Sequence, residues 1–156
     1  MADALSGIVE SYKEQPDKFE SEFRRKLQEA LLAAALLFYW TDILGAQDAV
    51  AEELEFIQPY LDKFTADLPS MTYKAAKNRA ALYATNFTRF IYRLSLVSSP
   101  YKKLRWKYTP EAHHCGDCKD LDGVVKNANE WLALGLYPRS GQTECLMNCK
   151  CYFEEV

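Results

Sequence analysis

The residues best suited to chemistry in this chain are its five cysteines, which all lie in the last third. Cys115-Gly-Asp-Cys118 forms one group, and Cys145-Leu-Met-Asn-Cys149-Lys-Cys151 forms another after an intervening stretch of 26 residues. Two short turns that each present thiolates, joined by a loop long enough to fold back, suit a tetrahedral metal ion, usually zinc. The sequence therefore predicts a structural zinc knuckle in which Cys115, Cys118, Cys149 and Cys151 offer four thiolates, with Cys145 as the fifth candidate and His113 or His114 as an outside substitute.

Disulfides, plain buried thiols and a reactive thiol are the competing interpretations of these cysteines. An odd number of cysteines in one segment, with no signal-peptide pattern after Met1, favours a reducing compartment, where clustered cysteines bind metal more often than they pair. His114 beside Cys115 could activate a thiolate, but neither this scheme nor a redox dithiol uses the second cysteine group. We therefore expect a protein that is not an enzyme, and we expect the nearby acids to form a solvated face: Asp117, Asp120 and Asp122.

The charges of the chain fall into three blocks. Residues 1–68 carry six Lys/Arg against fourteen Asp/Glu, residues 69–110 carry nine Lys/Arg and no acid, and residues 111–156 carry four against eight. The acid-free block needs a negative partner, which is nucleic acid, another protein or the chain's own acidic N-terminal half. We expect its aromatic residues to be mostly core and its cations to be an interaction surface, with Lys103, Arg105 and Lys107 as preferred contacts and Arg89 and Arg93 as further ones.

Four segments upstream of the cysteines have apolar residues at helical spacing. The first spans 5–12, the second runs from 17 to about 44 and ends at Gly45, the third starts near 47 and is kinked or broken by Pro59, and the fourth spans 71–97 with Ser70 as its N-cap. Residues 30–40 are apolar all round, so we expect the domain or neighbouring subunits to surround them. This run is shorter than the roughly twenty residues of a membrane span.

After Pro100 the apolar residues alternate instead. Lys103-Leu-Arg-Trp-Lys-Tyr108 predicts a half-buried strand with a cationic outer face, and residues 149–156 predict a second strand that pairs with it antiparallel. A short helix over 130–134, capped by Asn127 or Asn129 and stopped by Gly135, is expected between them. The 156-residue chain, 49% hydrophobic, is therefore expected to be an α+β protein with a helical body over 1–100 and a small β and zinc-knuckle module over 101–156.

Several of these motifs occur together in one known family. Leu104-Arg-Trp-Lys-Tyr-Thr-Pro110, His114-Cys-Gly-Asp-Cys-Lys-Asp-Leu-Asp-Gly123 and Asn148-Cys-Lys-Cys151 resemble the C-terminal module of the phage Mu F-like minor head proteins, also called phage head morphogenesis proteins. Members typically combine a basic strand containing Trp, a Cys-x-x-Cys, a Leu-Asp-Gly and a closing Asn-Cys-Arg-Cys. The resemblance covers about residues 78–156, and this chain has Leu146-Met147 where the family often has His-Pro, supplying Cys145 instead.

The resemblance implies a structural virion component that acts at the inner face of the capsid or around the portal, in capsid assembly, portal association or DNA packaging. Its implied partners are the portal or major capsid protein, with packaged DNA as an option, and assembly would take place in the host cytoplasm. The charge blocks and the apolar run fit self-association, and no membrane contact is expected. The alternative is a zinc-ribbon regulator that binds nucleic acid, for which affinity should fall steeply with salt.

Overall fold

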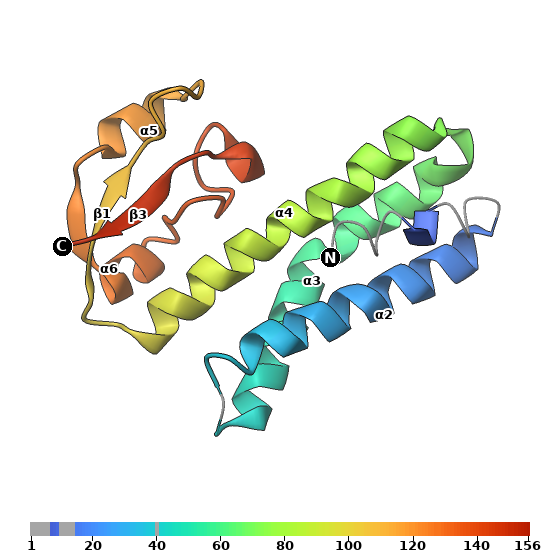
Figure 1. The fold of residues 1–156 in the computed structure, drawn as a ribbon, viewed down its shortest axis with the longest axis horizontal. Helices are drawn as coiled ribbons and strands as arrows, with labels where there is room; N and C mark the ends of the chain where they lie inside the picture. The colour runs from blue at the N-terminus through green and yellow to red at the C-terminus, as the bar shows by residue number, and fades with distance from the viewer. Residues whose placement is uncertain (1–6, 10–14, 40) are drawn as a thin grey trace. The chain divides into compact units, whose positions relative to one another are not determined.

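The computed structural model describes residues 7–9, 15–39 and 41–156, and the chain divides into two compact units, residues 1–87 and residues 88–156. The expected first segment, residues 5–12, lies largely outside the described residues. The first unit contains α2 (Pro16–Ala35), α3 (Ile43–Asp67), the 3-10 helix η1 (Leu68–Ser70) and the first part of α4 (Tyr73–Ser98) (Figure 1). The boundary between the units therefore falls within α4.

The second unit contains the rest of α4 and six short elements. They are β1 (Lys103–Lys107), α5 (Gly116–Leu121), β2 (Val125–Asn127), α6 (Ala128–Ala133), the 3-10 helix η2 (Leu146–Asn148) and β3 (Tyr152–Glu155). The strands form an antiparallel sheet in the order β2-β1-β3, in which Arg105 is opposite Val125 on one side and Glu154 on the other. Both expected strands and their antiparallel pairing are confirmed, and the chain has the expected α+β fold.

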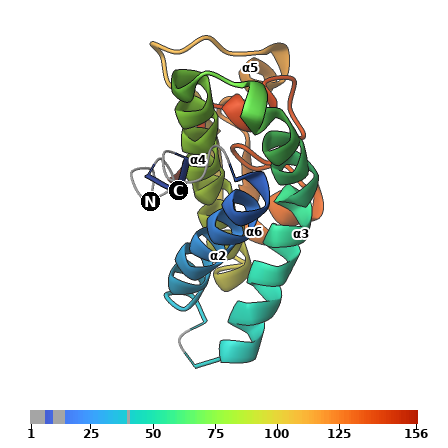
Figure 2. The same ribbon diagram turned by 90° about the vertical axis from the view of Figure 1, so that its right-hand side faces the viewer.

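Aromatic rings fill the interior of the first unit. Helices α2 and α3 lie side by side (Figures 1 and 2), and Phe19 and Phe23 of α2 meet Phe64 of α3 at ring-centroid distances of 5.2 and 5.9 Å. Tyr83 of α4 packs edge-on against Phe23 at 5.2 Å. Tyr83 and Phe90 of α4 are buried, whereas Tyr73 is 42% exposed, so the expectation that these aromatic residues are mostly core holds for only some of them.

The helix ends differ from the expected ones at three places. Helix α2 ends at Ala35 rather than near residue 44, because Asp42 starts a new helix by accepting a hydrogen bond from the Gly45 N–H at 2.9 Å. Pro59 lies inside α3 without breaking it. Thr72, rather than Ser70, caps α4, since its Oγ1 accepts from the Ala75 N–H at 3.2 Å.

Residues 30–40 were expected to be surrounded by the domain or by neighbouring subunits. Within a single chain only part of this run is buried. Leu31, Ala34 and Ala35 are buried, whereas Leu37 is 79% exposed just after α2 ends. Ile43 and Leu44, at the start of α3, are 60% and 73% exposed. We call Leu37, Ile43 and Leu44 the apolar corner, because all three are large aliphatic side chains at the α2–α3 connection.

The second unit is organised around two tryptophans. Trp106 of β1 and Trp131 of α6 are fully buried with their ring centroids 5.8 Å apart, and the Trp131 indole N–H donates to the Leu104 carbonyl at 3.0 Å. Helix α6 has Asn127, one of the two expected caps, as its N-cap, and the Asn127 N–H donates to Glu130 Oε2 at 2.7 Å. The helix begins at Ala128, two residues before the expected start, and ends before Gly135, which has a φ of 66°. The cysteines lie against this core.

Candidate metal centre

The first cysteine group lies at the start of α5. Cys115 is the N-cap of this helix with extended backbone, and Cys118, one turn further on, is fully buried. The other end of α5 is tied to the sheet, because the Gly123 N–H donates to the Trp106 carbonyl at 2.8 Å. The Gly123 φ of 82° is a conformation that favours glycine, which explains the Leu-Asp-Gly that follows the cysteines.

The second cysteine group surrounds η2. Cys145 precedes this 3-10 helix, and Leu146 adopts a φ of 50°, which turns the chain between Cys145 and Cys149. Cys149 and Cys151 are buried while Lys150 is exposed, but both cysteines precede β3 rather than lying on a strand. The Thr109 hydroxyl anchors this segment by donating to the Lys150 carbonyl at 2.7 Å.

The two groups converge on Cys118. Its sulfur lies 3.5 Å from that of Cys145 and 3.7 Å from that of Cys149, and the sulfurs of Cys115, Cys118 and Cys145 all lie within 4.8 Å of one another. Zinc–sulfur bonds of about 2.3 Å in a tetrahedron place neighbouring sulfurs about 3.8 Å apart. The spacing of these sulfurs is therefore compatible with a metal site.

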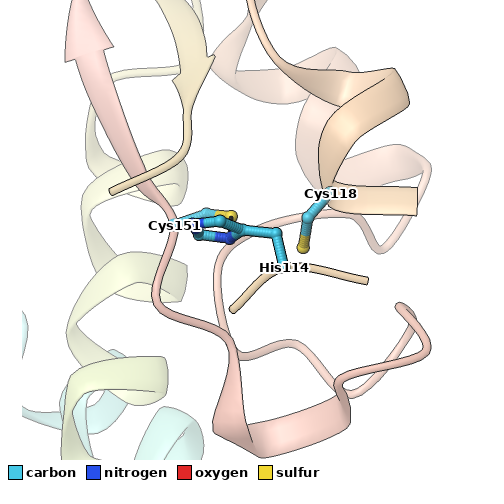
Figure 3. A group of neighbouring side chains, drawn as sticks. All are labelled: His114, Cys118 and Cys151. Atoms are coloured by element: carbon cyan, nitrogen blue, oxygen red, sulfur yellow. Dashed lines mark hydrogen bonds between the residues drawn. The ribbon is translucent and has the colours of Figure 1, made fainter. Parts of the chain in front are cut away.

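His114 and Cys151 lie next to this cluster. The Cys151 sulfur is 3.7 Å from His114 Nδ1, and a ring nitrogen of His114 and the sulfurs of Cys118 and Cys151 all lie within 4.8 Å of one another (Figure 3). His114 Nε2 is 2.6 Å from the Thr109 carbonyl oxygen, so Nε2 carries the proton and Nδ1 is left as an acceptor or ligand. The structure thus brings His114, and not the exposed His113, to the cysteines.

The thiols are crowded and mostly shielded from water. Burial raises the pKa of Cys118 well above its ordinary value, and it raises the pKa of Cys151 to about 11. Burial also raises the pKa of Cys145, although the Thr143 hydroxyl, 3.3 Å from its sulfur, opposes the shift. For Cys115 burial would raise the pKa too, but hydrogen bonds from Cys118 and Cys145 outweigh it and lower the pKa. A raised pKa keeps a thiol neutral, so a bound cation would have to stabilise the thiolate form for these sulfurs to act as ligands.

The five cysteines are free thiols, although they are close together. Sulfur–sulfur distances of 3.5 and 3.7 Å exceed the length of a disulfide, about 2.05 Å. A cluster of unpaired cysteines, three of them buried, offers the thiolate ligands that soft metal ions select. The donor set therefore fits a metal better than it fits a pair of disulfides.

The predicted contact cations are not all available on the surface. Arg105 forms an ion pair with Glu154 across β1 and β3 at 3.0 Å, and neighbouring Lys102 pairs with Glu155 at 2.6 Å. Arg89 is only 4% exposed and donates to the Tyr137 hydroxyl at 3.2 Å, so it lies in the interior of the second unit. Lys103 is exposed, while Lys107 and Arg93 are half-buried.

Comparisons with known proteins give no relative: no family model, no curated protein and no solved structure matches this chain. None of the described helices combines the length and hydropathy needed to cross a bilayer.

Proposed function

We propose that residues 88–156 form a module stabilised by one structural zinc ion, bound by Cys115, Cys118, Cys145 and Cys149. The observation that carries this proposal is the position of the Cys118 sulfur, 3.5 and 3.7 Å from two sulfurs of the other cysteine group. Four thiolates in a tetrahedron suit zinc, and a site closed by four protein ligands leaves no position for substrate. Zinc would therefore supply folding free energy rather than catalysis.

His114 and Cys151 have a supporting role in this proposal. His114 is oriented by the Thr109 carbonyl and faces the Cys151 sulfur. The Nδ1 atom can therefore accept a hydrogen bond from the Cys151 thiol, and the two side chains lie beside the proposed ligands and limit access of solvent to the metal. Cys151 is assigned to this shell because its sulfur lies 3.7 Å from His114 Nδ1, whereas the sulfurs of Cys145 and Cys149 lie 3.5 and 3.7 Å from that of Cys118.

The zinc content of the purified chain and of single Cys→Ser variants tests the ligand set. Wild-type protein should hold one zinc per chain by elemental analysis, and Cys118→Ser should lose it because Cys118 is central to the cluster. Cys151→Ser is the matched control, since it alters a buried cysteine of the same cluster and should keep the metal. A metal-free wild-type chain, or equal loss in Cys151→Ser and Cys118→Ser, would contradict the assignment.

We further propose that the chain is a non-enzymatic component of a phage head, with a role in capsid assembly, portal association or DNA packaging. The motif resemblance over residues 78–156 supports this role, and the proposed four-cysteine site would be closed to substrate. The portal or major capsid protein is the expected partner, and the virion, at the capsid interior or the portal, is the expected location. The apolar corner is a candidate surface for self-association or for docking on such a partner, since it exposes three large aliphatic side chains.

The regulator that binds nucleic acid has less support. Arg105 and Lys102 are engaged by Glu154 and Glu155, so the cationic face of β1 is partly neutralised within the chain. Lys103 and Lys107 are left as the contacts on this strand for an acidic partner or packaged DNA. Binding of short duplexes measured across a salt series separates the two functions: a regulator binds tightly with a steep slope, whereas a head component binds weakly and co-purifies with heads or portals.

A further inference from the structure

Two acidic side chains cross-link the cysteine-bearing turns in a reciprocal manner. The Gly116 N–H donates to Glu144 Oε2 at 3.0 Å, and the Glu144 N–H donates to Asp117 Oδ2 at 2.9 Å. Each turn thus provides one backbone donor and one carboxylate acceptor to the other turn. Asp117 departs from the expected solvated face, because its carboxylate is half-buried and accepts the Glu144 N–H.

The two hydrogen bonds act directly beside metal-ligand positions. Gly116 follows Cys115 in the chain, and Glu144 precedes Cys145. A Cβ atom added at Gly116 would lie 3.5 Å from Glu144 Oε2, so the carboxylate packs against the backbone of the first turn. The Cys115 sulfur and an oxygen from each of Asp117 and Glu144 lie within 4.8 Å of one another.

We propose that Asp117 and Glu144 are positioning residues for the metal centre, and this inference rests on the zinc site proposed above. By joining the turns, they hold the sulfurs of Cys115 and Cys145 at the separation that a bound metal requires. The turns therefore lose less conformational entropy when the metal binds. Hydrogen-bonding partners outside the ligand shell commonly have this effect on metal affinity. Four thiolates already complete the tetrahedron of the proposed site, which assigns the two carboxylates to positioning rather than to coordination.

The test is the zinc dissociation constant, measured by competition with a chromophoric chelator on the full chain. Asp117→Ala and Glu144→Ala should each raise it by about 10- to 100-fold. Asp117→Asn and Glu144→Gln keep an oxygen that accepts the same backbone N–H, so they should stay near the wild-type value. The Asp117→Ala, Glu144→Ala double variant should lose less than the product of the single effects, because each bond joins the same two turns.

Asp120→Ala is the matched control, since Asp120 is an exposed acid on the same helix. It should bind zinc as the wild-type chain does. Wild-type affinity in both alanine variants, equal weakening by Asp120→Ala, or Asn and Gln variants as weak as the alanine variants would each overturn the proposal. A wild-type chain that binds no zinc would instead overturn the metal site itself, so the two failures are distinguishable.

Discussion

In residues 1–87 four aromatic side chains from three long helices meet in the interior, whereas in residues 88–156 three cysteines are buried in the same cluster as Trp106 and Trp131. The first unit has helices of 20 and 25 residues, but most elements of the second have only three to six. Long amphipathic helices bury enough apolar surface to be stable by packing. Short elements that bury thiols gain less from packing, which is the situation in which metal binding contributes to folding.

Removing the metal should give the largest difference between the units. Chelation should unfold residues 88–156, because structural zinc contributes on the order of 10 kcal/mol to a small module, while the helices of the first unit stay folded. In a Trp40→Phe background, fluorescence would report on Trp106 and Trp131, both now fully buried, and should shift to the red. Far-ultraviolet circular dichroism should keep most of its helical signal. Unchanged tryptophan emission in chelator would remove the distinction between the units.

A cavity in the first unit should have the converse effect. Phe64→Ala should lower the free energy of unfolding of this unit by about 3–5 kcal/mol, since the ring is fully buried among Phe19, Phe23 and Tyr83. Zinc content should be unchanged. Phe56→Ala on the same helix is the control, because Phe56 is 37% exposed and should cost much less. Loss of zinc from Phe64→Ala would show that the two units do not act separately.

Alkaline pH should also affect the first unit through Tyr83. Burial raises the pKa of Tyr83 above its ordinary value, with Arg79 opposing the shift and Asp62 adding to it. The pKa of Tyr83 is higher in the folded chain than in the unfolded chain. Its contribution to the free energy of unfolding is therefore fully present below about pH 10, and it is lost as pH rises above that value, at about 1.4 kcal/mol per pH unit. Urea unfolding of the wild-type chain and Tyr83→Phe at pH 9 and pH 11 measures this loss. The variant should lose less, and equal losses would assign the effect to other groups.

The backbone of the second unit allows a smaller test. Leu146 is exposed and adopts a left-handed φ of 50°, which costs an L-residue with a side chain about 1–2 kcal/mol. Leu146→Gly should therefore be neutral or stabilising by about 1 kcal/mol, whereas glycine elsewhere usually destabilises. Thermal unfolding with bound zinc measures the effect, with Leu134→Gly in the ordinary helical region as the control. Equal destabilisation by both changes would contradict the strain at Leu146.

The parts of the fold that the sequence predicted correctly are those with a strong local signal. The alternation of apolar and charged residues around Trp106 predicted β1. The spacing of the cysteines predicted that Cys145 and Cys149 would lie close to Cys118. The end of α2 was predicted wrongly because residues 30–40 contain neither glycine nor proline. There the Asp42 cap, a single polar residue, outweighs an uninterrupted apolar pattern.

Other features carry no local signal at all. Strand β2 has three residues, too few for a period, and it exists because β1 offers it a pairing edge. Glu144 and Asp117 are separated by 27 residues, so their contact depends on how the cysteine turns fold. The sequence placed Arg89 among the cations of an expected interaction surface, yet in the structure Arg89 is buried and donates to the Tyr137 hydroxyl.

The sheet order β2-β1-β3 also affects how crowded copies of this protein would behave. Its two edge strands have only three and four residues, and they carry Lys126 on one side and Glu154 and Glu155 on the other. Short edges with charged side chains offer few free backbone groups to a strand from a second molecule. The small sheet is thus protected from edge-to-edge aggregation where local concentration is high.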